Sequence, residues 1–508
     1  MSESSKTIYF NIACIVTLLA FYFFQIAQGF NPQSLWLDDA WPAVLIKYFN
    51  FSNFYELKPS LPIGFVFTSS FFQKLISDPE IALQMLPICF AAFSIVIFFI
   101  TVFKTTKSTP TALMGTTLLV INPIFYKYSL RIKAYTADCF FICLIFLAGY
   151  YLLSNPSKKK LLIYCLVSAI ALLFSFTSPF LSVIFFHLAL IKIYREKAIS
   201  ARFCTLSLAS FNTFFLLTYY LLIRHQSNPC MKGYWAKYLA GSDSLTSILY
   251  FIQNSYTDTL VRPFPFPDVI TNLLPKEIAG LMLLFFSLIC CYRYSKYLCL
   301  TFIAFYSSLI IASILEIYPT GPIRISLFTF PMTIILASIG FKKLIAYHKL
   351  LAICTVGISI FLLLNMPSFS YPQSGFAAVI TELEKKLSKE DGLVLYPFST
   401  MPLAYYGNFP VKLISAPHYC TNFDAQIIRE KTFTPLADST DFRQNPNYGK
   451  QQTKDFLLQT NFKKAFYLAC KHDKHYHQSL KQSFIEADYI LDLKGHARHS
   501  ELAIFIKK

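Results

Sequence analysis

Apolar segments of membrane-spanning length recur from the N-terminus to about residue 365 and limit what this chain can fold into. An α-helix needs roughly 20 residues to cross a bilayer. By this measure the sequence predicts about eleven transmembrane helices, at about 8–30, 81–103, 111–127, 134–153, 161–176, 179–194, 203–223, 277–292, 297–315, 323–340 and 347–365. Hydrophobic residues fill 55% of the 508 positions and charged residues 14%, which excludes a water-soluble globule of this size. We expect an α-helical polytopic membrane protein.

Two apolar segments need a separate interpretation. The segment 8–30 is long for a signal peptide, and only Glu3 and Lys6 are charged before it, so we interpret it as a retained anchor rather than a cleaved leader. The segment 57–77 is interrupted by Lys58-Pro59 and Pro62. Because proline breaks a helix, we expect a helix that lies in or partly enters the membrane interface.

Lysine and arginine gather in alternate loops, and this pattern predicts the orientation. Five basic loops fall on one side, the cytoplasm by the positive-inside rule: Lys104 and Lys107; Lys158 to Lys160; Lys192, Arg195, Lys197 and Arg202; Arg293 and Lys296; Lys342, Lys343 and Lys349. The net charge of +18 is therefore a topology signal and does not indicate nucleic-acid binding. The loops 31–80, 128–133, 224–276 and 316–322 would face outward.

The segment pair at 161–194 affects this assignment. Thr177-Ser178-Pro179 divides it into two spans or kinks one long span. A single span would place the later basic loops on the opposite side, so the charge pattern favours two spans.

The sequence changes character after about residue 366, and this divides it into a transmembrane domain, 1–366, and an extracytoplasmic soluble α/β domain, 367–508. Hydrophobic periodicity in the tail predicts helices at 376–387 and 477–487, strands at 392–396 and 464–469, and a closing strand pair at 489–493 and 503–506. Cys420 and Cys470 would face an oxidising compartment and could form a disulfide.

Two adjacent acids follow the first apolar segment, between two tryptophans. Asp38 and Asp39 lie near the membrane boundary, where Trp36 and Trp41 also prefer to be. An exposed acidic turn that caps a helix starting near Ala40 is one interpretation, because aspartate is a good N-cap. The other is a pair of carboxylates that carries out chemistry at the outer face.

Cations in the outward loops depart from the positive-inside rule. Lys127, Arg131 and Lys133 gather in one loop, and Asp138 lies within the next apolar segment. If that helix begins near Arg131, then Arg131, Tyr135 and Asp138 share a face. An acid at membrane depth usually faces a polar cavity, although an Arg131–Asp138 structural pair is the alternative.

Two more outward cations come from distant parts of the chain. Lys58 precedes Pro59, and Arg324 ends the turn that begins at Tyr318. Each alone could be a side chain that snorkels to the interface. Together with the acids, however, Lys58, Arg131 and Arg324 are predicted to converge at one membrane face.

These motifs resemble those of GT-C glycosyltransferases of the family 39 type, which includes protein O-mannosyltransferases and the aminoarabinose transferase that modifies lipid A. The similarity covers roughly residues 1 to 365. Residues 35–40 resemble the family's Asp-Glu motif, 54–61 its Lys-Pro-Pro-Leu segment, 131–138 its Arg-x-x-x-Tyr stretch with a following acid, and 318–324 a late Tyr-Pro-x-Gly-x-Arg turn. Asp39 stands where the family has glutamate, and Ser60 where it has a second proline.

The resemblance implies transfer of a sugar, with inversion, from a polyprenyl-phosphate donor to a lipid, glycan or protein acceptor at the outer face of the inner (plasma) membrane. Asp38 would be the catalytic base beside Asp39. Lys58, Arg131 and Arg324 would hold the donor phosphate, with Tyr135, Asp138 and Tyr318 in support. No cofactor is expected, and a divalent metal is not required. The alternative is a transporter or flippase for lipid-linked saccharides, although repeated halves and broken helices typical of such proteins are not apparent.

Overall fold

The computed structural model describes residues 3–30, 35, 37–52, 54, 61–223, 235–240, 244–264, 275–321, 324–345, 349–366, 375–395, 399–415, 423–427, 432–433, 448–460, 462–470, 474–497 and 500–507. The chain divides into two compact units. The first joins Met1–Phe30, Gln84–Arg224 and Trp235–Ser370, and the second joins Asn31–Leu83, His225–Tyr234 and Tyr371–Lys508. The division into 1–366 and 367–508 stays a prediction.

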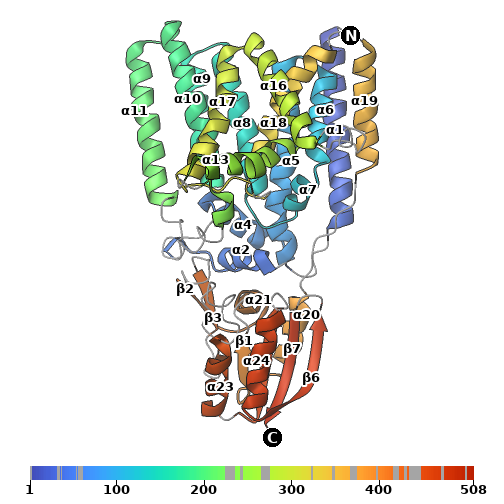
Figure 1. The fold of residues 1–508 in the computed structure, drawn as a ribbon, viewed down its shortest axis with the longest axis vertical. Helices are drawn as coiled ribbons and strands as arrows, with labels where there is room; N and C mark the ends of the chain where they lie inside the picture. Colours follow the sequence, from blue (N-terminus) through green and yellow to red (C-terminus); the bar gives the residue numbers. More distant parts are fainter. Residues whose placement is uncertain are drawn as a thin grey trace. The chain divides into compact units, whose positions relative to one another are not determined.

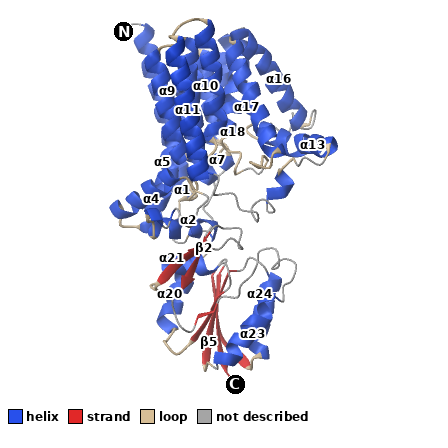
Figure 2. Ribbon diagram, turned by 90° about the vertical axis from the view of Figure 1, so that its left-hand side faces the viewer, coloured by secondary structure: helices blue, strands red, loops and turns tan. Residues whose placement is uncertain are grey.

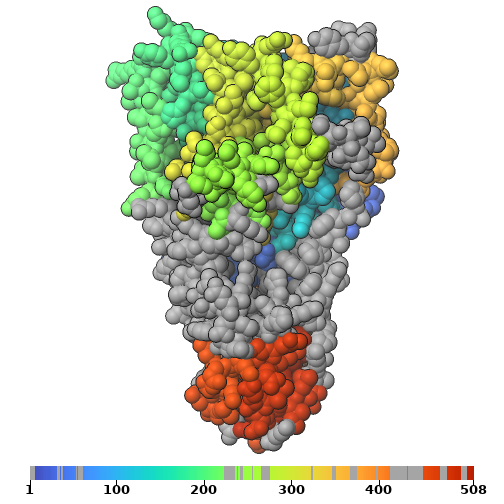
Figure 3. Space-filling view, in the orientation of Figure 1, coloured from blue at the N-terminus to red at the C-terminus, as the bar shows by residue number. Residues whose placement is uncertain are grey.

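The first unit is a helical bundle (Figure 1). Its described elements are α1 (Glu3–Gly29), α5 (Pro79–Thr106, which starts in the second unit), α6 (Thr109–Val120), α7 (Pro123–Ser129), α8 (Tyr135–Ser154), α9 (Lys158–Phe174), α10 (Ser178–Arg195), α11 (Ala201–Thr218), η1 (Tyr219–Ile223), η3 (Ala236–Tyr238), α13 (Leu245–Phe251), η4 (Ile252–Tyr256), α14 (Thr257–Val261), α16 (Lys276–Tyr294), α17 (Lys296–Ile314), α18 (Thr329–Ile345) and α19 (Lys349–Leu364). Residues of α13 and α16, coloured green to yellow-green, cover one face of this unit (Figure 3).

Every predicted apolar segment contains a helix. Among the described residues, seven helices are long and apolar enough to cross a membrane: α1, α5, α8, α10, α11 with η1, α16 and α17. The helices in the other four segments are shorter, with 12 residues in α6, 17 in α9, 17 in α18 and 16 in α19. The chain is thus a polytopic helical membrane protein, as predicted.

Two helix boundaries differ from the predicted ones, and the start of α8 agrees. Segment 111–127 forms two helices because Asn122 caps α7, accepting hydrogen bonds from the amides of Ile124 (3.0 Å) and Phe125 (3.4 Å), and Pro123 follows it. The helix after Arg131 begins at Tyr135, next to the predicted start at 134. The helix after Arg324 begins only at Thr329. Both arginines therefore lie in turns before a helix.

Helices α9 and α10 form a packed pair rather than one kinked span. The hydroxyl of Tyr164 donates a hydrogen bond of 2.7 Å to the carbonyl oxygen of Ser182. Residues 18 positions apart in one straight helix would lie about 27 Å apart, at 1.5 Å per residue. The preference for two helices at 161–194 is confirmed.

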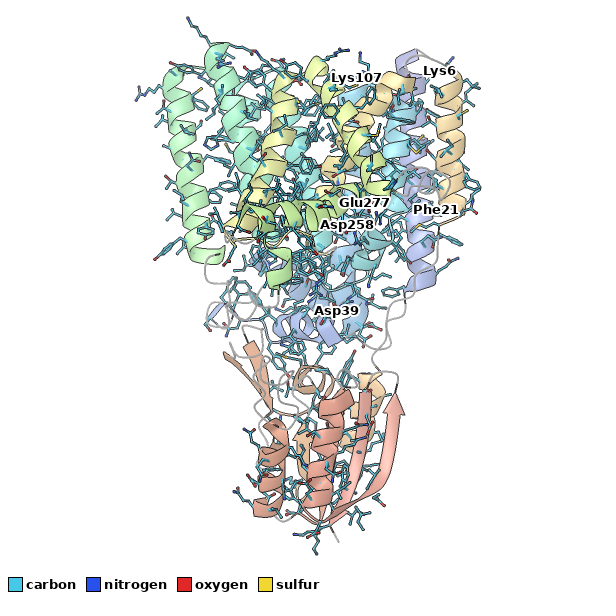
Figure 4. All side chains as sticks on the ribbon, in the orientation of Figure 1. Lys6, Phe21, Asp39, Lys107, Asp258 and Glu277 are labelled. Atoms are coloured by element: carbon cyan, nitrogen blue, oxygen red, sulfur yellow. The ribbon has the colours of Figure 1, made fainter. Side chains whose placement is uncertain are left out.

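The basic loops meet at one end of the first unit. The Tyr150 hydroxyl donates to the carbonyl of Lys104 (3.2 Å) and shares a hydrogen bond with the Tyr294 hydroxyl (2.9 Å). Lys6 and Lys107 lie at this same end of the bundle (Figure 4). Three further lysines of these loops lie over aromatic rings of neighbouring loops: Lys158 over Phe203, Lys192 over Tyr297 and Lys342 over Tyr294. The side of the membrane that this end faces stays a prediction.

The second unit contains α2 (Leu37–Lys47), α4 (Ile63–Leu75) and the C-terminal α/β domain. The predicted helix in 57–77 is present as α4, and its place in the interface stays a prediction. Tail elements are α20 (Phe376–Lys386), β1 (Gly392–Leu395), α21 (Thr400–Tyr406), β2 (Val411–Ser415), β3 (Phe423–Ile427), β4 (Thr432–Phe433), α23 (Tyr448–Thr460), β5 (Lys464–Cys470), α24 (Lys474–Glu486), β6 (Tyr489–Ala497) and β7 (Ser500–Lys507).

The tail forms a five-stranded sheet in the order β4-β1-β5-β7-β6, beside an antiparallel β2–β3 pair. Strand β1 runs parallel to β4 and β5, whereas β7 runs antiparallel to both β5 and β6. Helices α20 and α21 lie on one side of the sheet and α23 and α24 on the other (Figure 2). The two helices and four strands predicted for the tail are therefore confirmed. Cys420 lies outside the described residues, so its pairing with Cys470 stays a prediction.

Candidate functional site

The predicted acid pair lies in the first turn of α2. The helix begins at Leu37 and not near Ala40, so both acids are inside it. Asp39 is fully buried, with 0% of its side chain exposed, whereas Asp38 is half-buried. Helix α2 packs against α4 and α21. An exposed cap therefore does not describe Asp39, and the positive end of the helix dipole favours both carboxylates.

Three cations gather at the end of the first unit that carries the turn 130–134 and residues 315–321 and 324–328. Lys127 lies in the last turn of α7, Arg131 is buried with 5% exposure, and the guanidinium carbon of Arg324 lies 5.0 Å from the centroid of the Trp235 ring. Burial lowers the pKa of the Lys127 ammonium, and the positive charges of Arg131 and Arg324 lower it further. The local field therefore favours an anion, and we call these three side chains the cation cluster.

Asp138 is buried near the start of α8. The Ser175 hydroxyl donates a hydrogen bond of 2.5 Å to its carboxylate, and Thr177 approaches the same group. Ser175 and Thr177 form the turn between α9 and α10, which the carboxylate therefore ties to α8. Because α8 begins at Tyr135, as the predicted segment 134–153 has it, Arg131 lies outside the helix and the condition for a helix face shared by Arg131 and Asp138 is not met.

Tyr318 lies close to Asp138 and Tyr135. Burial raises the pKa of the Tyr318 hydroxyl well above its usual value, and the nearby Asp138 and Tyr135 raise it further. The hydroxyl donates to the carbonyl of Ile325 at 2.7 Å, which closes the turn that carries Arg324. Gly321, with φ of 128°, supplies a backbone conformation that other residues rarely adopt.

The predicted site residues belong to different parts of the described structure. Lys58 lies outside the described residues. Asp38 and Asp39 belong to the second unit, whereas Arg131, Arg324, Tyr135, Asp138 and Tyr318 belong to the first. Their convergence at one membrane face stays a prediction. Trp235, the partner of Arg324, could not be found from the sequence, because a single tryptophan in a long loop carries no pairing signal. In the part of the chain that the structure describes, no group of three or more His, Cys, Asp or Glu side chains could hold a metal ion.

The fold is similar to that of a protein of known structure. No protein-family model and no curated protein sequence matches the chain. Two crystal structures of ArnT from Cupriavidus metallidurans do match it. The apo structure has a TM-score of 0.54 at 10% identity, covering 99% of this chain and 98% of ArnT. The structure bound to undecaprenyl phosphate has a TM-score of 0.53 at 11% identity, covering 97% of each. The chain therefore has the fold of ArnT over nearly its whole length.

Proposed function

We propose that this protein is a membrane glycosyltransferase that takes its sugar from a polyprenyl-phosphate carrier. The observation that carries this proposal is the cation cluster, in which Arg324 joins Lys127 and Arg131 from a distant part of the chain. It occurs in the fold of a protein that has been solved with undecaprenyl phosphate. Cations that depart from the positive-inside pattern suit the phosphate of such a carrier.

The proposed reaction is a single displacement with inversion. A hydroxyl oxygen of the acceptor bonds to the anomeric carbon while the bond from that carbon to the phosphate oxygen breaks. Asp38 accepts the hydroxyl proton, and the carrier leaves as a phosphate monoester anion. Lys58, Arg131 and Arg324 stabilise the charge that develops on the phosphate, and Lys127 joins them. Asp39 supports Asp38.

The two acids are suited to different roles. A base must reach the acceptor hydroxyl, which the half-buried Asp38 can do more readily than the fully buried Asp39. Tyr318 supports the Arg324 turn through its hydrogen bond to Ile325, and Asp138 supports the start of α8 through Ser175. Tyr135, which lies close to Tyr318, is the third supporting residue in this proposal.

The test uses the purified full-length protein with a polyprenyl-phosphate sugar that is radiolabelled in the sugar. A transferase releases the sugar to an acceptor or to water, and the carrier phosphate appears in equal amount. A transporter or flippase moves the intact labelled lipid between the leaflets of a vesicle and cleaves nothing. Movement without cleavage would contradict the proposed function.

A further inference from the structure

The helix that carries the acid pair is bound at both ends by the last turn of α21 in the tail. Before its start, the backbone amide of Leu35 donates a hydrogen bond of 2.6 Å to the hydroxyl oxygen of Tyr406. At its end, the Lys47 ammonium donates to the carbonyl oxygen of Tyr405, also at 2.6 Å. Asp38 and Asp39 lie between these two points, in a helix of 11 residues. All of these residues belong to the second unit.

The Tyr406 hydroxyl joins three separate segments of the chain. It accepts from Leu35 and donates its own proton to Oε1 of Glu80 at 2.6 Å. Glu80 is buried, with 7% exposure, in the first turn of α5. That turn is itself capped, because Oδ1 of Asp78 accepts from the amides of Glu80 (2.9 Å) and Ile81 (3.0 Å). A short hydrogen bond to a carboxylate is strong, so the hydroxyl is well placed to hold Leu35.

The contact at the other end of α2 is electrostatic. Lys47 lies against the carbonyl oxygens of Tyr405 (2.6 Å) and Ala404 (3.4 Å), which are at the C-terminal end of α21. The negative end of the helix dipole attracts the ammonium there. The hydroxyl of Tyr48 donates to the same Ala404 carbonyl at 3.3 Å. Two attachment points restrain the rotation of α2 about its own axis, which one point would not.

Rotation of this helix matters because neighbouring side chains point in different directions. Successive residues of an α-helix are about 100° apart around the axis. A small rotation of α2 would therefore turn the Asp38 carboxylate away from an acceptor hydroxyl without unfolding anything. Since a 1 Å misplacement can cost about 10²-fold in rate, the hold on Leu35 has consequences for turnover.

We infer that Tyr406 of the C-terminal domain is a positioning residue for the acid pair: its hydroxyl fixes the entry of α2 through Leu35 and so sets the direction of Asp38. The inference rests on the proposed function for its effect on turnover. It gives the tail a role in the reaction although Tyr406 touches no reacting atom.

The test compares two Tyr→Phe variants of the full chain. Y406F removes the hydroxyl that holds Leu35 and keeps the ring. Y489F is the matched control, because the hydroxyl of the buried Tyr489 also bonds to the backbone of a distant residue, donating to the carbonyl of Phe462 at 2.8 Å within the tail. We expect Y406F to lower kcat about tenfold or more with the donor KM unchanged. Y489F should leave both constants as they are, even where it lowers the melting temperature equally.

A second measurement does not depend on activity. Hydrogen exchange at the amides of residues 35–39 should become faster in Y406F and stay unchanged in Y489F. Glu80→Gln keeps an acceptor oxygen for Tyr406 and should retain turnover, whereas Glu80→Leu should resemble Y406F. The inference is overturned if Y406F and Y489F have equal kcat in an active background, or if exchange at 35–39 is the same in both. A wild-type protein that never cleaves the donor would instead contradict the proposed function, and hydrogen exchange would still decide whether Tyr406 holds α2.

Discussion

The hydroxyl of Tyr164 in α9 donates a hydrogen bond of 2.7 Å to the carbonyl oxygen of Ser182 in α10. This contact shows that 161–194 is a packed pair of helices, and the presence of two helices here determines the direction of the helices that follow. With two helices here, the basic loops after α5, α8, α10, α16 and α18 gather at one end of the bundle. The cation cluster then belongs to the opposite set of loops, and a topology prediction follows.

We predict that Ser157 faces the cytoplasm and Ser34 the outside. Single cysteines at these positions, in a background without the native cysteines, should differ in their reaction with a membrane-impermeant thiol reagent in intact cells. Ser34→Cys should react, and Ser157→Cys should react only after the membrane is opened. The reverse labelling pattern would show that the proposed site does not lie at the outer face of the membrane.

Arg131→Ala should weaken use of the donor. Loss of a hydrogen bond to a charged group costs about 1.5 to 3 kcal/mol, so kcat/KM for the donor should fall roughly 10- to 150-fold. The matched control is Lys343→Ala, which removes an exposed cation near the end of α18, in the basic loops. Lys58→Ala is expected to behave like Arg131→Ala. Equal kinetics in all of these variants would mean that the outward cations only anchor the helices.

Donor affinity should decrease as the pH rises, and the decrease should begin at a lower pH than it would for a lysine with the usual pKa. Burial and the two arginines lower the pKa of Lys127 from its usual 10.5. Only the charged ammonium attracts phosphate, so binding weakens as the pH rises through this lowered pKa, and donor binding takes up a proton. Donor titrations between about pH 7 and pH 10 measure this. Lys127→Arg stays charged over that range and should bind independently of pH. A wild-type curve that is equally flat would exclude Lys127 from the site.

Asp38→Asn should reduce turnover by roughly 10²- to 10⁴-fold, the usual loss when a general base is removed, while donor binding is largely kept. The amide keeps the shape of the carboxylate, so α2 should remain folded. Asp39→Asn is the companion variant. If Asp39→Asn abolished turnover and Asp38→Asn did not, the two roles would be exchanged. Full activity in both variants would mean that the two acids have no catalytic role and only place negative charge in the first turn of α2.

Activity should persist in a chelator. The proposed clamp neutralises the leaving phosphate with side-chain cations, and a monophosphate can be bound in this way without a metal. Turnover in excess EDTA should match that in its absence. A loss that Mg²⁺ or Mn²⁺ restores would assign Asp38 and Asp39 to metal binding instead of base catalysis.

The sequence determined the features that depend on local patterns. Apolar length located a helix in each of the eleven segments, loop charge grouped the basic loops that meet at one end, and periodicity identified the helices and strands of the tail. The sequence predicted the first residue of each helix less well than the presence of the helix. The start of α8 was predicted to within one residue, but α18 begins at Thr329 and not at 323. The turn that carries Arg324 depends on particular backbone conformations, such as that of Gly321, which hydropathy does not report.

Only the tertiary structure decided which distant residues meet. The Leu35–Tyr406 hydrogen bond joins positions 371 residues apart, and the cation cluster joins α7 to the turn before α18. No local pattern encodes such a pairing, because it depends on how helices pack and which polar groups are left to satisfy one another once they are buried. The residue types of the acids and cations were therefore evident in the sequence, whereas the burial of Asp39 and the hold of the tail on α2 required the fold.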